Sequence, residues 1–399
     1  MTSETRRRRR LVEQVVLAAL ADHGELSRAE IQRVTGIPRA TVIATVATLV
    51  AEGRLVEGSP VKGERGRPAN RIRLPCESGA IVVADSSQGV VRLALVSTDG
   101  VVIASAERRY DWLDPGRGWV RTCGCLDEVP ALLEMYDDLR PALPAETPIR
   151  AGVVGVWGPF VPGRGWDDGC AAAKSPSPGP PPIALPRHDP ARALEQGLGI
   201  SVRSERGPVL RATGEVAAGA AQSGRAVLYL QVAEVLASAI VVEGRPFTGA
   251  DGMAGELTHI VAGNSGQPCF CGRRGCLGAT VGVGYLIDTL RPVHGSFGID
   301  DVLRLAADGE RSVRRAFEMV GRQLGSALTN ALALMGVDLV VVDADLGPAG
   351  VIVGDAFAEM IALGYPPASP RVPEVRVGAL PQTGYAVGGA ALLRQQSRV

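Results

Sequence analysis

Apolar residues recur at helical spacing in three short segments near the start of the chain, residues 11–22, 27–35 and 38–51. Ser27 and Glu30 have the spacing of a capping box, which marks the start of the second helix. Only a short turn separates the second helix from the third, and three helices so arranged predict a helix-turn-helix. The inward face of the third helix is expected to consist of Val42, Val46, Leu49 and Val50.

A basic β-hairpin is predicted directly after these helices. Residues 53–57 and 71–74 are interpreted as its two strands, and the loop over residues 58–68 is rich in glycine, lysine and arginine. We interpret the hairpin as a wing, although any small helical domain could carry a basic hairpin. The side chains expected to contact DNA from its tip are Lys62, Arg65 and Arg67. The Gly-Arg-Pro context of Arg67 is typical of an extended arginine that enters an A·T-rich minor groove.

Strands and helices alternate along the rest of the chain, beyond a linker predicted at residues 75–79. Apolar runs predict strands at residues 81–85, 90–96, 101–107, 151–156, 226–232, 238–242 and 339–343, and helical spacing predicts helices at 119–139 and 310–335. Such alternation is typical of an α/β fold. Residues 162–190, rich in proline, glycine and serine, are expected to form an irregular insertion. No internal sequence repeat is evident.

The 399 residues carry 42 basic and 42 acidic side chains, but these charges are unevenly distributed. Residues 1–74, which we call the head, hold 14 basic and 8 acidic residues, whereas the remainder of the chain holds 28 and 34. A basic head on an acidic body favours nucleic-acid binding. The run from Arg6 to Arg10 fits a solubilising tail equally well, and we expect it to add sequence-independent affinity for phosphates.

The apolar runs and the cysteines indicate the cellular location of the protein. The chain contains no apolar run of the roughly 18 residues that a membrane-spanning helix needs, and it lacks the apolar core of a secretory signal. A cytoplasmic protein with no membrane partner is therefore expected. Seven cysteines, an odd number, disfavour a disulfide framework and point to metal binding instead.

One histidine and three cysteines follow the pattern H-x9-C-x-C-x4-C. They are His259, Cys269, Cys271 and Cys276. Three thiolates and one imidazole complete a tetrahedral zinc site with no position left for water, so we predict a structural zinc rather than a catalytic one. A chance cluster of cysteines is the alternative. Cys123 and Cys125 have no neighbouring histidine or cysteine, and we interpret them as ordinary thiols rather than as a redox pair or a second metal site.

A winged helical head followed by a body with the segments Gly249-Ala-Asp-Gly-Met-Ala-Gly-Glu-Leu-Thr-His259 and Cys269-Phe-Cys-Gly-Arg-Arg-Gly-Cys-Leu277 resembles the ROK family of repressors, open reading frames and sugar kinases. The resemblance extends from about residue 10 to residue 395. It implies an N-terminal winged helix-turn-helix followed by a two-lobed actin-like ATPase fold, with sugar and ATP meeting in the cleft. Repressors of this family keep the body as a sugar sensor.

The resemblance also implies domain boundaries. The winged head covers residues 1–74, and the first lobe of the body covers residues 80–200. The second lobe, which contains the zinc motif, covers residues 201–379. A C-terminal helix at about residues 380–396 is expected to return to the first lobe.

The sequence departs from the kinase members of the family at three segments that contact phosphate. Kinase members have an Asp-x-Gly-Gly-Thr loop where this chain has Asp85-Ser-Ser-Gln-Gly89, so two glycines that allow close backbone approach are replaced. The second loop, residues 233–237, contains no glycine and includes Glu234, and the third has the sequence Asp343-Ala-Asp345. Carboxylates at these positions repel ATP.

The catalytic aspartate of the family belongs to an Asn-Asp pair nine residues before a glutamate. Counting back from Glu215 places Arg206 and Gly207 at this pair, with Glu205 as the adjacent carboxylate. Transfer of a phosphoryl group to a sugar hydroxyl needs a carboxylate base. We therefore predict that the chain has no catalytic residue and is not an enzyme.

Sugar recognition is altered in the same region. Family members bind sugar hydroxyls through that pair, through a glutamate and a histidine that match Glu256 and His259, and through a glutamate replaced here by Gly278. Arg206 in the cleft would favour an anion, so the candidate effectors are a sugar, a sugar phosphate or a sugar acid. The predicted effector-binding residues are Arg206, Glu256 and His259. A vestigial pocket that binds nothing is the alternative.

The third helix of the head presents Arg39, Thr41 and Thr45 on a face opposite Val42 and Val46. We expect Thr41 to bind phosphate and Arg39 to reach a guanine edge, whereas Thr45 could equally be a surface residue without a role.

Together these features predict a DNA-binding transcriptional regulator, a repressor, built on a sugar-kinase-like body. A two-fold operator needs a two-fold protein, so a homodimer or higher homo-oligomer on double-stranded DNA is expected. Two alternatives stay open. One is an active ATP-dependent sugar kinase with a DNA-binding head, and the other is a scaffold that binds DNA constitutively and has no ligand.

Overall fold

The computed structural model describes residues 11–20, 26–61, 69–73, 79–87, 90–109, 128–156, 189–233, 236–250, 252–262, 266–269, 273–295, 298–369 and 371–396. The chain divides into two compact units, residues 1–78 together with 392–399, and residues 79–391. Within the described ranges, no single helix has both the length and the apolar composition needed to cross a membrane. Two neighbouring helices of the head are apolar enough when taken together, but they are bent by 119° relative to each other.

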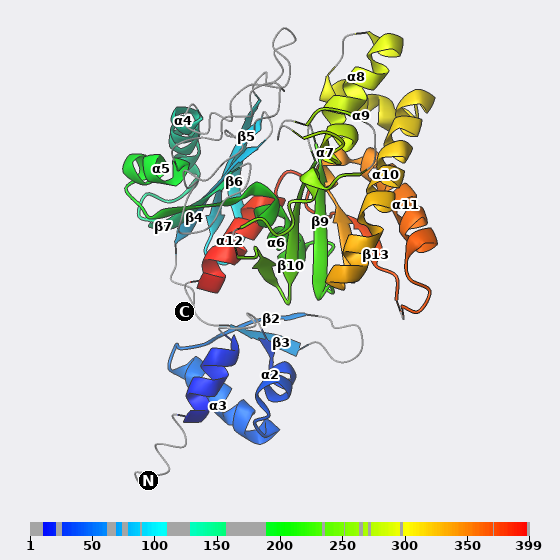
Figure 1. Cartoon of the computed structure of the whole chain (residues 1–399). Helices are drawn as coiled ribbons and strands as arrows, with labels where there is room; N and C mark the ends of the chain where they lie inside the picture. The colour runs from blue at the N-terminus through cyan, green and yellow to red at the C-terminus, as the bar shows by residue number, and fades with distance from the viewer. Residues whose placement is uncertain are drawn as a thin grey trace, which may run out of the picture. The chain divides into compact units, whose positions relative to one another are not determined.

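The head contains the predicted helices and hairpin. Its elements are a helix over Leu11–Leu20, β1 (Leu26–Ser27), α2 (Arg28–Thr35), α3 (Arg39–Ala51), β2 (Val56–Val61) and β3 (Ala69–Arg73). The three strands form an antiparallel sheet in the order β1-β3-β2, in which β2 and β3 are the wing (Figure 1). Val42, Val46 and Leu49 are buried as predicted, and Val50 is half-buried. The tip of the wing lies outside the described residues.

The first helix does not bury all of the apolar residues that its helical spacing places on one face. Leu11 is 62% exposed and Val15 is 39% exposed, although both belong to the apolar set. The buried positions include Glu13 and Val16, and Arg54 pairs with Glu13 at 3.3 Å. Helical spacing fixes the period of an apolar face, whereas packing against α3 and the wing fixes its rotation.

Hydrogen bonds at both ends hold α2 in place. Ser27 Oγ accepts from the backbone N–H of Glu30 at 3.3 Å, and the Glu30 carboxylate accepts from the N–H of Ser27 at 2.8 Å, which confirms the capping box. Arg71 of β3 donates to the same carboxylate at 2.7 Å. The helix ends at Gly36, whose φ of 68° is the left-handed conformation that glycine adopts without strain.

The body contains two five-stranded sheets of equal topology. The first sheet has the order β6-β5-β4-β7-β8, and the second has the order β11-β10-β9-β12-β13. In each sheet, three antiparallel strands are followed along the chain by two strands that add in parallel. The body is therefore a structural duplication that no repeat in the sequence reveals.

The strands of the first sheet are β4 (Ala80–Ser87), β5 (Val90–Ser97), β6 (Val102–Arg109), β7 (Ile149–Val156) and β8 (Val202–Arg206). Those of the second sheet are β9 (Ala226–Val232), β10 (Leu236–Val242), β11 (Arg245–Phe247), β12 (Leu339–Val342) and β13 (Glu374–Val377). Every strand predicted from the sequence of the body is present.

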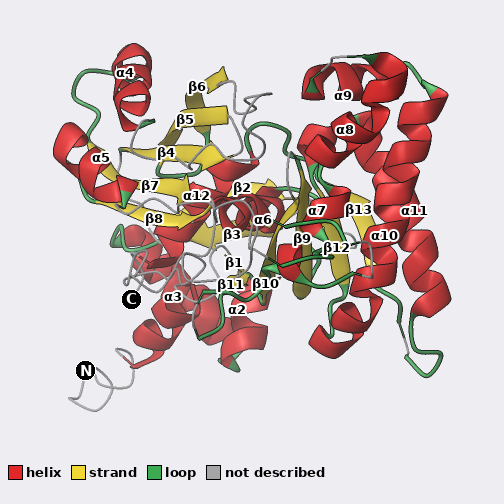
Figure 2. Cartoon of the chain, turned by 45° about the horizontal axis from the view of Figure 1, so that its top comes forward, coloured by secondary structure: helices red, strands yellow, loops and turns green. Residues whose placement is uncertain are grey.

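Helices pack on both faces of each sheet (Figure 2). α4 (Val129–Leu139) and α5 (Pro190–Leu198) pack on the outer face of the first sheet, and a 3-10 turn over Arg140–Ala142 follows α4. The apolar core of the second sheet is formed with α7 (Gly278–Val281), α8 (Val283–His294), α9 (Ile299–Ala307), α10 (Arg311–Met335) and α11 (Pro348–Gly364). α6 (Gly207–Ala218) contacts strands of both sheets and is buried from Gly207 to Glu215.

Two predicted segments extend beyond the described residues. The helix predicted at 119–139 is described from Val129 onward, and most of the predicted insertion at 162–190 lies outside the described ranges. The helix predicted at 310–335 is confirmed as α10.

The C-terminal helix α12 (Gly384–Gln396) crosses α6 at backbone contact. A methyl group at Gly388 would overlap the carbonyl oxygen of Leu210, and one at Gly214 would overlap the carbonyl oxygen of Gly384. At Gly389 a methyl group would collide with Val83 of the first sheet. Glycines therefore allow α12 to pack on the first sheet beside α6.

Gly388→Ala is expected to destabilise the chain by about 1–3 kcal/mol or more, because α6 and α12 must separate to admit the methyl group. Gly384→Ala on the same helix is the matched control, since its nearest neighbour would be the Cβ of Leu380 at 3.6 Å. That variant should be neutral or slightly stabilising. Urea denaturation of the two full-length variants measures the difference, and equal midpoints would contradict the close crossing.

Candidate functional site

The head presents one exposed helical face with little negative charge nearby. The axes of α2 and α3 differ by 119°, which is within the range of DNA-binding helix-turn-helix motifs. Arg39, at the start of α3, is exposed, and Thr41 and Thr45 are half-buried. At 100° per residue, Thr41 and Thr45 lie on one flank of the buried face of α3 and Arg39 lies on the other. Their contacts with DNA stay a prediction. Lys62, Arg65 and Arg67 lie outside the described residues, so their contacts stay a prediction.

The described arginines of the head fall into two groups. Arg28, Arg54 and Arg71 each pair with a carboxylate, and the pairs of Arg28 and Arg71 connect α2 to the wing. The bonds from Arg28 and from Asn70 lower the pKa of Glu57 to about 2. Arg33 and Arg39 are exposed and have no carboxylate within ion-pair distance among the described residues. They flank the turn between α2 and α3 and place positive charge there, although the charge of Arg33 also acts on Glu30 and helps to lower the pKa of that carboxyl.

Three of the four predicted metal ligands meet in the body. One ligand atom from each of His259, Cys269 and Cys276 lies within 4.8 Å of the others. Cys276 is fully buried and Cys269 is 4% exposed. Burial lowers the pKa of His259, and the charge of Arg273 lowers it further, so the imidazole is neutral as a metal ligand must be. Cys271 lies outside the described residues.

The geometry of this cluster fits zinc. Cys269 Sγ and His259 Nδ1 are 3.6 Å apart. Ligands at about 2.3 Å and 2.1 Å from a tetrahedral ion are separated by about 3.6 Å. Short antiparallel bridges pair Val261 with Cys276 and Pro268 with Arg274, and they hold the loop that carries the cysteines. The three described residues therefore suit a metal site, whose ion would bind side chains from a loop and from a 3-10 turn (Leu257–His259).

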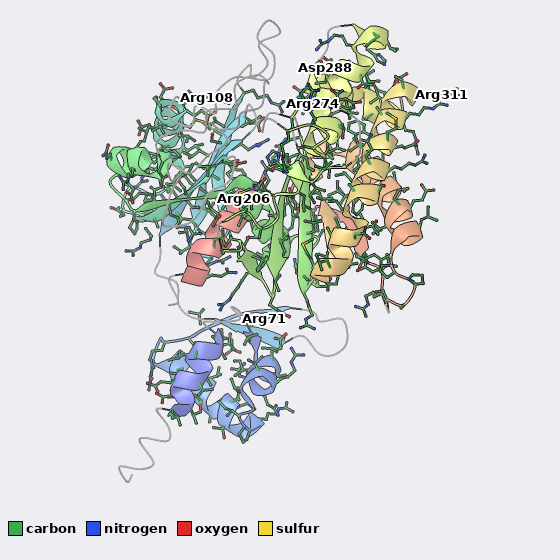
Figure 3. All side chains as sticks on the ribbon, viewed as in Figure 1. Arg71, Arg108, Arg206, Arg274, Asp288 and Arg311 are labelled. Carbon is green, nitrogen blue, oxygen red and sulfur yellow. The ribbon has the colours of Figure 1, made fainter. Side chains whose placement is uncertain are left out.

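Arg206 lies at the centre of the body, at the end of β8, and its side chain is 1% exposed (Figure 3). Its Nη2 lies 2.5 Å from Glu256 Oε1 and donates to the carbonyl oxygen of Ser238 at 2.8 Å. Its Nη1 donates to the carbonyl oxygen of Ala254 at 2.9 Å. The structure thus brings together two of the predicted effector residues, but as an ion pair. Binding of an anionic effector by Arg206 stays a prediction.

Two other predicted sugar contacts are also changed. His259 points a ring nitrogen at Cys269 and so belongs to the metal cluster. A side chain at position 278 would collide with Thr258, whose methyl group fills the space beside Gly278. The glutamate that sugar-binding members carry there therefore has no room in this chain. Glu256 remains 14% exposed and His259 is half-buried, so both of these predicted sugar contacts retain some solvent access.

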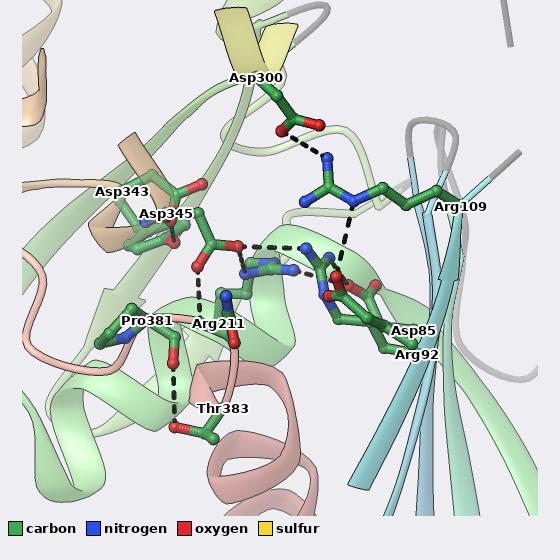
Figure 4. Close-up of polar contacts among 12 residues, drawn as sticks. Asp85, Arg92, Arg109, Arg211, Asp300, Asp343, Asp345, Pro381 and Thr383 are labelled. Atoms are coloured by element: carbon green, nitrogen blue, oxygen red, sulfur yellow. Dashed lines mark hydrogen bonds and ion pairs between the residues drawn. The ribbon is translucent and has the colours of Figure 1, made fainter. Parts of the chain in front are cut away.

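A network of buried charges connects the two sheets (Figure 4). Arg211 of α6 donates through Nη2 to Asp85 at the end of β4, at 2.9 Å, and through Nη1 to Asp345 after β12, at 3.0 Å. The Arg92 guanidinium of β5 lies 3.5 Å from Asp345 and 3.8 Å from Asp85. Asp85 is fully buried and the side chain of Arg211 is 2% exposed. Two of the segments predicted to contact phosphate in kinases are therefore joined here by arginines.

A third carboxylate completes the network. Asp343 accepts from Tyr229 Oη at 2.9 Å and from the backbone N–H of Asp345 at 3.1 Å. Burial raises the pKa of Asp343 to about 6; the charge of Arg211 opposes the shift and the charge of Asp345 adds to it. Burial alone would lower the pKa of Arg211, but the surrounding aspartates raise it well above its usual value. Arg211 is therefore permanently charged.

Comparison with known proteins identifies the family of this chain. The sequence profile of the ROK family matches residues 180–396, more than half of the chain. The chain belongs to the ROK family. The profile of the IclR helix-turn-helix domain matches residues 15–58, which cover α2 and α3. The expected fold class, a helix-turn-helix followed by a two-lobed actin-like body, is confirmed.

Relatives include both regulators and kinases. The xylose repressor of Bacillus subtilis is 21% identical over 332 residues, which are 80% of this chain and 78% of the repressor. A solved ROK family transcriptional regulator, described as a homologue of the E. coli MLC protein, has a TM-score of 0.66 at 18% identity and covers 96% of this chain and 95% of its own. A ROK glucokinase from Streptomyces griseus has a TM-score of 0.62 at 19% identity, over 79% of this chain and 100% of its own.

The sequence did not identify Arg92 and Arg211 of the ROK body as residues of the site. Asp343 and Asp345 are predicted from the sequence to repel ATP, but Asp345 pairs with Arg92 and Arg211. The same two arginines also pair with Asp85. Arg211 lies in the middle of a largely buried helix, and a basic residue at such a position is a signal for a buried partner. The sequence does not reveal which carboxylates are the partners, because Asp85 and Asp345 are 126 and 134 residues away.

Arg211→Met tests the role of this network. Methionine keeps an unbranched side chain but leaves the buried Asp85 and the half-buried Asp345 without this counter-ion, so we expect a loss of about 3–5 kcal/mol in the free energy of unfolding. The control is Arg109→Met, which breaks an exposed pair with Asp300 at 2.7 Å and should cost less than about 1 kcal/mol. Urea denaturation of both variants gives the two values. If the losses are equal, burial of the network makes no special contribution.

Proposed function

We propose that this ROK protein is a DNA-binding transcriptional repressor whose sugar-kinase-like body has lost phosphoryl transfer. The observation that carries the proposal is the exposed face of α3 on a helix-turn-helix that bends by 119°, with Arg33 and Arg39 beside it. The similarity to xylose repressors over most of both chains supports the same function. DNA would be bound by Arg39, Thr41 and Thr45 of α3 and by the basic tip of the wing.

Loss of kinase activity is inferred from two arginines. Arg206 stands where kinase members are expected to have their Asn-Asp pair, and it neutralises Glu256. Arg211 occupies the space between Asp85 and Asp345, the segments expected to face phosphates. A nucleotide would have to displace a buried guanidinium from two carboxylates, which then would repel its phosphates. These contacts support a body that serves regulation rather than catalysis.

A titration of labelled duplex DNA by fluorescence anisotropy tests DNA binding. Duplexes are first selected from a random library with the full-length protein, since the operator is unknown. Arg39→Ala should weaken binding by roughly 5- to 150-fold, the loss expected for one base-reading arginine of about 1–3 kcal/mol. Arg311→Ala, an exposed arginine at the start of α10, is the control and should leave affinity unchanged.

Two results would contradict the proposed function. One is the absence of any preferred duplex after selection at moderate salt. The other is steady ATP turnover in the presence of hexoses in a coupled assay, which would make the protein a kinase with a DNA-binding head.

We propose that His259, Cys269, Cys271 and Cys276 bind one structural zinc ion. The distances among the three described ligands support this set. When bound, zinc cross-links the loop to the 3-10 turn, and the side chains of Arg273 and Arg274 donate to backbone carbonyls of the same region. A homodimer remains our expectation from the two-fold symmetry of operators.

Elemental analysis of the purified protein should find about one zinc per chain. Cys276→Ser should lose the metal and lower the melting temperature, because metal binding and folding of such loops are coupled. Cys123→Ser, which lies outside the motif, should keep the full zinc content. Retention of zinc by Cys276→Ser would rule out this ligand set.

A further inference from the structure

The exposed face of α3 is apolar, which is unusual for a helix in contact with solvent. Val42, Val46 and Leu49 point into the core of the head. The outward positions between Arg39 and the end of the helix are instead Ala40, Ile43, Ala44 and Ala47. Ile43 is 44% exposed, so a large branched side chain stands in the middle of this face. Together with the three exposed alanines, Ile43 forms one continuous apolar face, and a continuous exposed apolar face is typical of an interaction site.

Hydrogen-bonding groups on this helix are sparse. Thr48 donates its hydroxyl to the carbonyl oxygen of Ala44 at 3.0 Å, so that hydroxyl is used within the helix. Thr41 and Thr45 are half-buried at its sides. Arg39 is the only charged residue of α3, and it lies at the N-terminal end. Direct reading of donors and acceptors therefore has few side chains to work with along most of α3.

The surroundings of the face identify the occupant as a polyanion. Residues 31–51 contain no aspartate or glutamate. Arg33 and Arg39, which have no carboxylate partner among the described residues, flank its start. Apolar side chains between unpaired arginines suit a surface that combines negative charge with methyl groups. The major groove of DNA provides both, because each thymine places its C5 methyl group there.

We infer that α3 recognises the C5 methyl groups of thymine, with Ile43 as the residue that determines specificity and with Ala44 and Ala47 in contact beside it. This inference rests on the proposed DNA-binding function. Ala40 and Ala47 are about 10 Å apart along the helix axis, which corresponds to roughly three base pairs. The face therefore selects a short run of two or three A·T pairs in each half-site, while Arg39 anchors the end of the helix.

Thymine-to-deoxyuridine substitution tests this inference, because it removes the methyl group and leaves every hydrogen-bonding atom in place. Each thymine of a selected duplex is replaced in turn, and binding of the full-length protein is measured by fluorescence anisotropy. Two or three substitutions per half-site should each weaken binding by about fourfold, the effect of burying one methyl group. Replacement of thymines outside the half-sites should change nothing.

Ile43→Ala should weaken binding to the thymine duplex and abolish the thymine–uracil difference at one position while leaving the others. Leu334→Ala is the matched control, since Leu334 on α10 is 88% exposed and also apolar. The melting temperature of Ile43→Ala should match that of the parent, because the side chain is largely outside the core. Ile43→Val is the milder variant and should reduce the same difference in part.

The possible outcomes distinguish methyl recognition by α3 from the DNA-binding function itself. Unchanged affinity for every deoxyuridine duplex, together with tight binding that still depends on Arg39, overturns methyl recognition and leaves the repressor function standing. If the thymine–uracil difference persists in Ile43→Ala at every position where the parent shows it, the role of Ile43 is overturned. Failure to select any duplex overturns the proposed function itself, and the exposed face of α3 would then be a contact for another protein.

Discussion

The guanidinium of Arg211 is the interaction on which the architecture of the body depends. Its side chain is buried, and a charge in such a place is tolerated only with partners at hydrogen-bonding distance. Asp85 lies near the end of β4 in the first sheet, and Asp345 follows β12 of the second. Because removal of the cation would leave two nearby carboxylates to repel each other, the ends of the two sheets are held at a fixed separation around α6.

α6, which carries Arg211, also packs against α12 through glycines. The centre of the body is therefore constrained both by ion pairs and by close backbone packing. Gly214 and Gly388 let the helix backbones touch, which leaves no space to accommodate a shift of one helix along the other. The carboxylate of Glu215 accepts from the backbone N–H groups of Ala220, Ala379 and Leu380, and it thereby attaches the start of α12 to the end of α6. Packing and polar contacts therefore act together on the segment between the lobes.

Local patterns in the sequence predicted local structure well. Ser27 and Glu30 form the capping box, α10 has its predicted span, and the alternating runs of the body are its strands. The spacing of His259, Cys269 and Cys276 predicted their proximity, because ligands of one ion must be close in space. Contacts over long separations were not predictable. The partner of Arg206 and the partners of Arg211 depend on how two sheets of unrelated sequence come together, and no local pattern encodes that meeting.

Glu30 has a consequence for how the head presents itself to a duplex. One carboxylate caps α2 and also accepts from Arg71 of the wing. A tilt of the wing away from the helices would pull on the carboxylate that also caps α2. The hairpin and the helices therefore move as one rigid unit. A rigid unit of fixed width binds duplexes whose grooves already match it and disfavours those that must be deformed. The rigidity of the head thereby makes binding depend on the shape of the DNA.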